Sequence, residues 1–341
     1  MKVQNFVPIY LFNKNYIPVD ARFVEKPEEY DPSDTTMLQL ANNIHGLNDV
    51  RNLTLHKTYK MKAFLGTGLL GSGFVRAMIN KGEQLQVWNR TTSKARELEQ
   101  YGAKAFEDIA AAASNADVIH LALKDDASVD EALREAEPGL AHGAIIVDHT
   151  TTSIEGAKRR TAEWQSKGFL YQDAPVFMGP QNALESTGYM LVSGNQELVK
   201  KLESQLSAIT GKLINFGEEP GKAAAMKLTG NLFLVAFTAG IADTLSFAHG
   251  LNISVSDLSQ LFDNWNPGSS LPARLKRMTA DDFGDASWRL DMARKDTGLF
   301  IQEAANKNVT LAVIPAVAML MDEWIQKGHG KDDWTIIGKV E

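Results

Sequence analysis

Three glycines at a fixed spacing, Gly66, Gly68 and Gly71, follow a short apolar segment of the chain. The segment 62–66 has the length and side chains of a buried strand, and the apolar positions within 72–81 recur with the period of a helix. In such a unit the first glycine permits a tight turn, the second lets backbone N–H groups approach a pyrophosphate, and the third lets the helix pack against the strand. The helix N-terminus adds partial positive charge, so the spacing predicts an anion site.

The context of these glycines decides between a dinucleotide site and a flexible turn, because the bare motif is weak. A second strand is predicted at 84–88, which completes the order strand, glycine turn, helix and strand. We therefore expect a dinucleotide site here. The residues expected to surround its pyrophosphate are Gly66, Thr67, Gly68, Leu69, Leu70 and Gly71.

The residues after the second strand indicate which dinucleotide is bound. Sites that prefer NAD usually place a carboxylate there, which accepts a hydrogen bond from the ribose 2′-OH. This chain offers a guanidinium, an ammonium and hydroxyls instead, and these groups suit a 2′-phosphate. The sequence therefore predicts NADP(H) in preference to NAD(H), bound by Asn89, Arg90, Thr91 and Lys94. The alternative is that Arg90 and Lys94 only solvate a loop and the start of a helix.

A second candidate for chemistry is Lys227, which lies where a long apolar segment begins. Asn231 follows four residues later, and on a helix this spacing places both side chains on one face. An ammonium and an amide could converge there on one substrate oxygen, and burial would lower the lysine pKa toward the range useful for proton transfer. The alternative is a lysine whose ammonium reaches solvent along an apolar stem. The spacing alone leaves both open.

The composition of the 341-residue chain excludes several classes of protein. A net charge of −7 and the lack of a basic stripe argue against a nucleic-acid-binding protein. The chain has no cysteine, which excludes disulfides and thiolate metal sites, and its seven histidines are scattered. We therefore predict neither a metal nor a nucleic-acid partner.

Nothing at the N-terminus looks like a signal peptide. The longest uncharged apolar segment, 228–242, has 15 residues and contains Asn231, so it is short for a membrane span. We expect a cytoplasmic enzyme with no membrane partner.

Residues 1–60 differ from the rest of the chain, because they combine four prolines and an acidic segment with no sustained helical or strand period. They are predicted to be a weakly structured N-terminal extension. Met61 directly precedes the first strand, so the alternative is that translation starts there.

Predicted strands and helices alternate from 61 to 220, which indicates a Rossmann domain with a doubly wound parallel sheet. From 221 to 341 only helices are predicted, so we expect an all-α domain for substrate binding and dimerisation. The helix at 222–249 is apolar on nearly every face, which predicts burial in protein. The predicted strands are 62–66, 84–88, 117–123, 144–148, 169–173, 189–193 and 213–216, and the predicted C-terminal helices are 222–249, 255–263, 286–307 and 311–326.

From Met61 to the C-terminus the chain resembles the β-hydroxyacid dehydrogenase family, which includes 3-hydroxyisobutyrate dehydrogenase and the glyoxylate/succinic semialdehyde reductases. Besides the glycine turn, Asp148–Thr151 looks like the family's Asp-x-Ser-Thr loop, and Asp173–Val176 opens its substrate loop. Lys227 with Asn231 matches the lysine helix, and the pair at 295–296 matches a Lys-Asp pair on a C-terminal helix. The motifs occur in the family's order, so together they are highly specific.

This resemblance implies a role for each matching residue. Lys227 would be the general acid/base, and Asn231 would be a substrate ligand. The residues implied to bind substrate are Thr150, Thr151, Gly179, Asn231 and Trp288, and those implied to bind the coenzyme, besides the glycine turn and 89–94, are Leu123, Lys124, Thr151 and Lys295. The alternatives are structural: a helix cap at Thr151, core packing of Trp288, and an ion pair of Lys295 with a neighbouring aspartate.

The chain departs from the family pattern in the substrate loop. Where the family commonly continues Pro-Val-Ser-Gly-Gly, this chain has Phe177 and Met178 in place of Ser-Gly, and the segment up to Gly188 is about two residues longer. The serine hydroxyl that would bind a carboxylate is therefore missing, the glycine that would do so through its N–H is replaced, and Phe177 with Met178 could wall an apolar pocket. Gly230 replaces an asparagine of the lysine helix, which leaves the spacing of Lys227 and Asn231 unchanged.

On these grounds we expect an NADPH-dependent oxidoreductase that interconverts a small aldehyde or keto acid and the corresponding hydroxy acid by hydride transfer. One alternative is an imine reductase, although relatives with that activity usually lack the lysine. The other is a non-catalytic NADP(H)-binding protein of the same fold. A homodimer or homotetramer is a further expectation from the resemblance.

Overall fold

The computed structural model describes residues 61–339. The weakly structured extension predicted for residues 1–60 lies outside the described residues.

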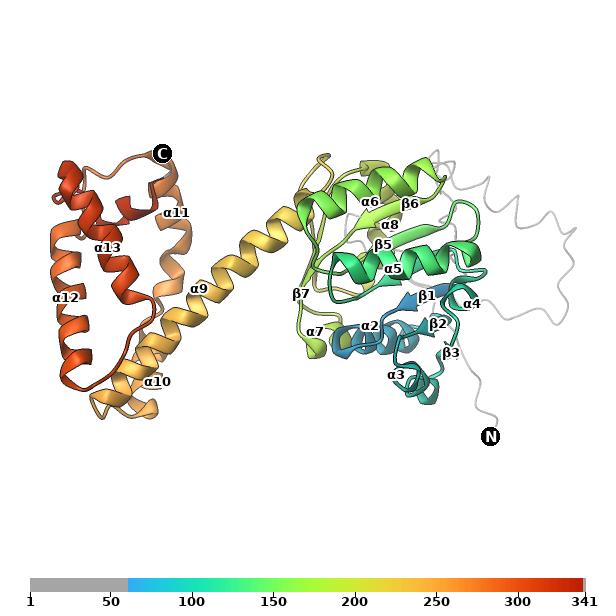
Figure 1. The fold of residues 1–341 in the computed structure, drawn as a ribbon, viewed down its shortest axis with the longest axis horizontal. Coiled ribbons are helices and arrows are strands. Elements are labelled where there is room, and N and C mark those ends of the chain that lie inside the picture. Colours follow the sequence, from blue (N-terminus) through green and yellow to red (C-terminus); the bar gives the residue numbers. More distant parts are fainter. Residues whose placement is uncertain (1–60, 340–341) are drawn as a thin grey trace, which may run out of the picture. The chain divides into compact units, whose positions relative to one another are not determined.

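The first part of the described chain forms a six-stranded parallel sheet with the order β3-β2-β1-β4-β5-β6 (Figure 1). The chain adds strands on one side of β1 and then on the other, so the strand order reverses between β1 and β4. This topology confirms the predicted doubly wound α/β fold. The strands are β1 (Lys62–Leu65), β2 (Leu85–Trp88), β3 (Lys104–Phe106), β4 (Val118–Leu121), β5 (Ile145–Asp148) and β6 (Leu170–Asp173).

Helices cover both faces of this sheet because alternate strand residues point to opposite sides. On β1, Phe64 packs in one apolar cluster with Phe74 and Met78, while Ala63 and Leu65 belong to a second cluster formed with α4, α5 and α6. Burial on both sides explains the continuous apolar runs of these strands. The helices of this part are α2 (Leu69–Asn80), α3 (Thr92–Arg96), α4 (Ile109–Ala113), α5 (Asp126–Ala136), α6 (Ile154–Ser166), α7 (Pro180–Glu185) and α8 (Gln196–Ala208).

A second sheet has three strands, β7 (Val176–Phe177), β8 (Tyr189–Val192) and β9 (Lys212–Asn215). Strand β7 is antiparallel to β8, and β8 is parallel to β9. The sequence pattern does not predict β3 or β7, because strands of three and two residues are too short to show a period. Strand β7 carries Phe177, so the substrate loop departs from the family pattern at the edge of a sheet.

The C-terminal part of the described residues is helical, as predicted, and its exact boundary stays a prediction. A small apolar core joins residues of α12 and α13, among them Leu290 and Trp324. The long helices are α9 (Lys222–Gly250), α10 (Val255–Asn264), α11 (Leu271–Ala280), α12 (Leu290–Asn306) and α13 (Ile314–Trp324).

The prediction that the helix now labelled α9 is buried is wrong for the single chain. Its apolar side chains are largely exposed; Leu232 is 72 % and Val235 is 69 % exposed. A helix that is apolar on all sides needs partners on all sides, and the described part of this chain supplies them only near the two ends of α9.

Helix α9 is also long and apolar enough to cross a membrane, judged by length and composition alone. Its charged residues nevertheless have protein partners. The Asp243 carboxylate is buried and accepts hydrogen bonds from the backbone N–H groups of Ala312, Val313 and Ile314, at 2.7, 2.8 and 3.1 Å. These hydrogen bonds give partners to backbone N–H groups at the start of α13. Asp243 therefore joins α9 to another helix of the protein.

Candidate active site

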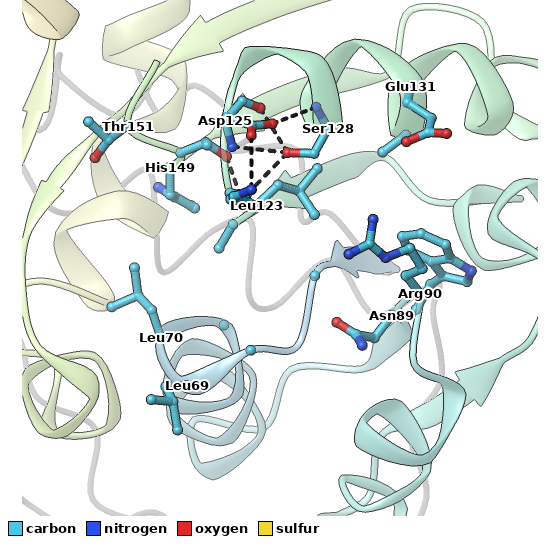
Figure 2. A pocket seen from close by; sticks show the side chains of 18 of the residues that line it. Leu69, Leu70, Asn89, Arg90, Leu123, Asp125, Ser128, Glu131, His149 and Thr151 are labelled. Atoms are coloured by element: carbon cyan, nitrogen blue, oxygen red, sulfur yellow. Dashed lines mark hydrogen bonds and ion pairs between the residues drawn. The ribbon is translucent and has the colours of Figure 1, made fainter.

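A cavity of about 960 Å³ opens at the carboxyl ends of β1 and β4, where the strand order reverses (Figure 2). Open α/β sheets commonly bind ligands at this point. The glycine turn, the loops after β2, β4 and β5, helix α5 and the start of α9 all contribute to its walls. The predicted site residues that line it are Gly66, Gly68, Leu69, Leu70, Gly71, Asn89, Arg90, Thr91, Lys94, Leu123, Lys124, Thr150, Thr151 and Lys227.

The glycine turn has the geometry of a phosphate cradle. Gly66 has a φ of +97°, and a Cβ at Gly71 would overlap the Gly66 carbonyl oxygen. A Cβ at Gly68 would meet no atom within 4 Å, so the space above it is open. Helix α2 has no side-chain cap and no acidic residue in its first turn, which leaves its first N–H groups available to an anion. The turn therefore fits a pyrophosphate.

The residues after β2 have two different roles: one supports the glycine turn, and the others are available for binding. The Asn89 Oδ1 accepts a hydrogen bond from the Thr67 N–H at 3.1 Å, so Asn89 supports the glycine turn, a role that the spacing does not predict. Arg90 and Lys94 line the cavity, and neither has an ion-pair partner among residues 61–339. Figure 2 shows Arg90 toward one end of the cavity and Thr151 toward the other. Both cations are available for a phosphate at the Arg90 end.

Helix α5 forms a wall of the cavity that the sequence prediction missed. Asp125 caps this helix, because its Oδ1 accepts from the Ser128 N–H at 2.9 Å while the Asp125 N–H donates to the Ser128 Oγ at 3.0 Å. This reciprocal cap is a local signal that the Asp-x-x-Ser spacing after the third predicted strand could have given. The residues of α5 that line the cavity are Ala127, Ser128, Glu131, Ala132 and Glu135.

Thr150 and Thr151 have different environments. The Thr150 hydroxyl oxygen accepts from the Leu123 N–H at 2.9 Å, which ties the loop after β5 to the loop after β4. Thr151 is exposed in the cavity, so its hydroxyl is the one that a ligand can reach. The alternative that Thr151 caps a helix is wrong, because Ser153 is the N-cap of α6.

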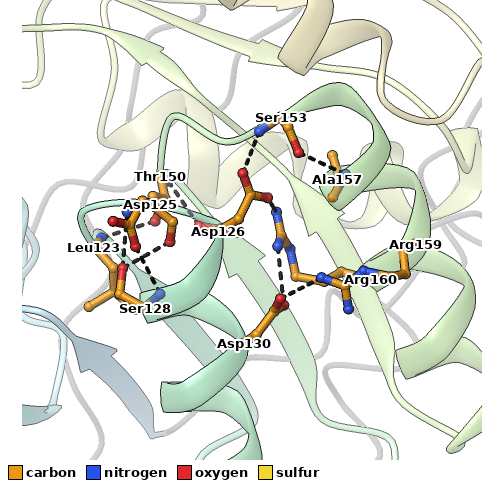
Figure 3. Close-up of polar contacts among 12 residues, drawn as sticks. Leu123, Asp125, Asp126, Ser128, Asp130, Thr150, Ser153, Ala157, Arg159 and Arg160 are labelled. Carbon is orange, nitrogen blue, oxygen red and sulfur yellow. Dashed lines mark hydrogen bonds and ion pairs between the residues drawn. The ribbon is translucent and has the colours of Figure 1, made fainter.

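A polar network anchors this loop, and Figure 3 shows the part of it in which Arg160 contacts Asp126 and Asp130. The Asp148 carboxylate accepts from the Thr150 N–H at 2.9 Å and from the Tyr171 hydroxyl at 2.6 Å. The fully buried Arg160 donates from Nε to the Tyr171 hydroxyl oxygen at 3.0 Å and from its other nitrogens to Asp126 and Asp130 at 2.8 and 3.2 Å. Burial raises the pKa of Asp148, and these donors oppose that rise. The network fixes the loop that presents Thr151.

Two buried histidines lie beneath the same loop, and sequence reasoning did not single them out. The His149 Nδ1 is 2.9 Å from the Ala174 carbonyl oxygen, which can only accept, so this nitrogen carries the proton. The His149 Nε2 then accepts from the His120 Nδ1 at 3.0 Å. Burial lowers the pKa of His149 to about 4 and also lowers that of His120, so both rings are neutral near pH 7.

Lys227 has the geometry that its spacing from Asn231 predicts. Its Nζ donates to the Asn231 Oδ1 at 3.1 Å, and the residue is 8 % exposed, so the ammonium does not extend into solvent. The Phe177 ring centroid lies 4.2 Å from the same Nζ. Burial lowers the pKa of Lys227. A buried ammonium thus lines the cavity that also holds the glycine turn.

Five predicted residues do not line the cavity of this chain: Thr67, Gly179, Asn231, Trp288 and Lys295. The Gly179 N–H donates to the Asn182 Oδ1 at 2.9 Å at the start of α7. Trp288 packs edge-on against Trp334, with 5.5 Å between ring centroids, and Lys295 forms an ion pair with Asp296 at 2.9 Å. The ligand contacts predicted for these five residues stay predictions. Within residues 61–339 no group of three or more His, Cys, Asp or Glu side chains could hold a metal ion.

The sequence and the fold match those of known proteins. Residues 62–217 match the family model described as the NAD binding domain of 6-phosphogluconate dehydrogenase. The chain is 27 % identical over 283 residues to the 3-sulfolactaldehyde reductase of Escherichia coli, covering 81 % of this chain and 93 % of that protein. It is 26 % identical to a probable mitochondrial 3-hydroxyisobutyrate dehydrogenase-like protein of Arabidopsis thaliana, covering 79 % and 81 % of the two chains. The chain is related to the β-hydroxyacid dehydrogenases.

The resemblance stated from the motifs is thereby confirmed, and the chain is an oxidoreductase with an NAD(P)-binding domain that is similar to these dehydrogenases and reductases. Its fold is shared more widely. An imine reductase from Myxococcus stipitatus, solved in complex with NADP⁺, superposes with a TM-score of 0.76 at 22 % identity, over 81 % of this chain and 98 % of that one.

Proposed function

We propose that this β-hydroxyacid dehydrogenase relative is an NADPH-dependent oxidoreductase that interconverts a small aldehyde or keto acid and the corresponding hydroxy acid. One observation carries the proposal: Lys227 is buried and lines the same cavity as the glycine turn. A coenzyme bound at the turn and a proton donor in the same cavity are the two parts that carbonyl reduction needs.

The chain's own residues hold the coenzyme and move the proton. The glycine turn takes the pyrophosphate, and Arg90 with Lys94 takes the 2′-phosphate. When bound, NADPH supplies a hydride to the carbonyl carbon. Lys227 donates a proton to the carbonyl oxygen in the reductive direction and, as a neutral amine, accepts one in the oxidative direction. Its lowered pKa brings both forms closer to neutral pH, which favours proton transfer.

Asn231 and Thr151 orient the reacting groups. Asn231 accepts one hydrogen bond from the Lys227 ammonium and so fixes where the other N–H bonds point. The exposed hydroxyl of Thr151 lies on a loop that the Asp148 network holds, which lets it bind the substrate in a fixed position. Rigid support of this kind is what turns a nearby hydroxyl into an orienting group.

Reduction of a C=N bond is a second candidate, supported by the apolar Val176 and Met178 in the cavity wall. An iminium cation would be repelled by the Lys227 ammonium, whereas a carbonyl oxygen is attracted to it. This charge argument favours the carbonyl substrate.

We also propose that the enzyme is cytoplasmic and forms a homodimer or homotetramer through α9. The exposed apolar residues of this helix would be covered by a second copy of the chain, which would satisfy the prediction that it is buried in protein. They are Leu228, Leu232, Phe233, Leu234, Val235, Phe237, Ile241 and Leu245. Light scattering coupled to size-exclusion chromatography would contradict the assembly if it gave the mass of one chain.

The test of the function is NADPH oxidation, followed spectrophotometrically with glyoxylate, succinic semialdehyde, methylglyoxal, butyraldehyde and a cyclic imine. For Lys227→Ala we expect kcat with the best carbonyl substrate to fall about 100-fold or more, because general acid catalysis contributes that much, while the Kd for NADPH is unchanged. Lys222→Ala is the control, since Lys222 starts the same helix with an exposed side chain. A protein that only binds NADPH would turn over none of these compounds, and an imine reductase would turn over only the imine.

A further inference from the structure

The cavity that holds the glycine turn is lined by cations from one segment and by acids from another. Arg90 and Lys94 line it from the segment after β2, whereas Glu131 and Glu135 line it from helix α5. Figure 2 shows Glu131 toward the same end as Arg90 and away from Thr151. Both glutamates are exposed, and neither has an ion-pair partner among residues 61–339. Two acids are therefore available to a ligand in the cavity that also presents two cations.

These two acids are the polar groups that α5 offers to a ligand. Ala127 and Ala132, which also line the cavity, carry no polar side-chain atom. The Ser128 hydroxyl is already used, because its oxygen accepts from the Asp125 N–H at 3.0 Å and its proton is donated to the Asp125 carbonyl oxygen at 2.8 Å. An ionised carboxylate has only acceptors, so a polar group bound to this wall must supply an N–H or O–H donor.

The phosphate sites limit where the base of a bound coenzyme would lie. In the proposed complex the pyrophosphate lies at the glycine turn and the 2′-phosphate lies at Arg90 and Lys94. Both phosphate groups are attached to the adenosine ribose, and the adenine ring is attached to the same sugar. The ring would therefore lie next to this ribose at the Arg90 end of the cavity, where Figure 2 also shows Glu131.

Position along α5 distinguishes the two acids. The loop before this helix approaches the glycine turn, since a Cβ at Gly66 would lie 2.5 Å from the Ala122 carbonyl oxygen. Ala127, Glu131 and Glu135 are spaced four apart, so they share one face of α5, and each step moves about 6 Å along the helix axis away from the turn. Ala127 would then lie beside the ribose, Glu131 beside the base, and Glu135 beyond it.

Resting on the NADPH site of the proposed function, we propose that Glu131 reads the base of the coenzyme by accepting a hydrogen bond from the 6-amino group of adenine. This amino group lies on the edge of the base away from the ribose, so the carboxylate acts at a distance from the 2′-phosphate that it would repel. A base with a carbonyl oxygen at position 6 brings an acceptor toward the carboxylate and is disfavoured. Glu131 is thus a specificity-determining residue for an adenine coenzyme.

The hypoxanthine analogue of NADPH, deamino-NADPH, tests the proposal, because its base carries a carbonyl oxygen in place of the 6-amino group. Titrations that follow the nicotinamide fluorescence should give the wild type a Kd about 10-fold higher for deamino-NADPH than for NADPH, as expected for one hydrogen bond to a charged group. In Glu131→Ala, and in Glu131→Gln, whose amide offers a donor as well as an acceptor, this ratio should fall to about one. The ratio cancels any general effect of the lost charge on the 2′-phosphate, which both dinucleotides carry.

Glu135→Gln is the matched control, since it removes the same charge from the same face of α5 and should keep the wild-type ratio. A wild-type ratio of about one would overturn the proposal, and so would a loss of selectivity in Glu135→Gln as large as that in Glu131→Gln.

Binding is the readout, so the result does not depend on turnover. If the protein selects NADPH in this way but reduces no carbonyl compound, the proposed function fails and the role of Glu131 stands. If it reduces a carbonyl compound with both dinucleotides bound equally well, the proposed function stands and the role of Glu131 fails. A protein that binds neither dinucleotide would contradict both.

Discussion

The two ends of the cavity differ in the groups that form them: mainly backbone at the coenzyme end and side chains at the substrate end. At the coenzyme end the contacts come from backbone N–H groups and glycines, and the chain keeps the family pattern there. At the substrate end they come from side chains, and the chain departs from the pattern at Phe177, Met178 and Gly230. A backbone cradle has one geometry that works, whereas a side-chain wall can change without altering the fold. Lys227 lies where the two meet.

The glycine turn offers the sharpest way to break this comparison. Gly71→Ala should destabilise the folded protein, because its Cβ would overlap the Gly66 carbonyl oxygen. Gly68→Ala should leave stability nearly unchanged, since its Cβ has open space, but weaken NADPH binding about 100-fold by blocking the approach of the pyrophosphate. Thermal melts and coenzyme titrations measure the two effects separately. Unchanged NADPH affinity in Gly68→Ala would show that no pyrophosphate lies over this glycine.

Arg90 tests the comparison of the two ends further, because its side chain is expected to bind the coenzyme at the end where most contacts come from the backbone. Arg90→Ala should weaken NADPH binding about 10- to 100-fold through the loss of charge-assisted hydrogen bonds to the 2′-phosphate. The affinity for NADH, which lacks that phosphate, is the internal control and should stay the same. An equal loss for both coenzymes would contradict the assignment of Arg90 to the 2′-phosphate.

At the substrate end, Asp173 begins the loop that carries Phe177, and it should give a pH-dependent effect. Burial, and then the charge of Asp148, raises its pKa to about 8 from an ordinary value of 3.8. The carboxyl group ionises in the unfolded chain from about pH 4 but in the folded protein only near pH 8, so the free energy of unfolding falls as the pH rises through this range and levels off above it.

Asp173→Asn stays uncharged at every pH, so its free energy of unfolding should exceed that of the wild type by about 2 kcal/mol at about pH 5 and by on the order of 6 kcal/mol at about pH 9. Chemical denaturation at the two pH values measures the difference. Asp263→Asn, on the exposed face of α10, is the control. If the free energy of unfolding of the wild type had the same pH dependence as that of Asp173→Asn, the buried acid would not titrate in this way.

The coenzyme end was predictable because its signal is local: strand, glycines and helix lie within about 20 residues of sequence. The signal of Lys227 and Asn231 was equally local, since they lie four residues apart. Their hydrogen bond confirms the prediction that both side chains lie on one face of the helix. The Arg160 network was not predictable, because Arg160 reaches Asp126 across 34 residues of sequence. The contact between Phe177 and Gly230 depends on a two-residue strand with no detectable period. The exposure of α9 was missed because its composition predicts burial in protein but does not indicate whether the same chain or a second chain covers the helix.

The measurement that tests the central claim most directly is the single-turnover rate of carbonyl reduction as a function of pH, with NADPH saturating, in the wild type and Lys227→Ala. Because reduction needs the protonated lysine, the wild-type rate should fall as the pH rises through a pKa that lies below the ordinary value for lysine. Lys227→Ala should be at least about 100-fold slower, should lack this pH dependence, and should bind NADPH with wild-type affinity. A variant that kept the wild-type rate and pH profile would contradict the role of Lys227.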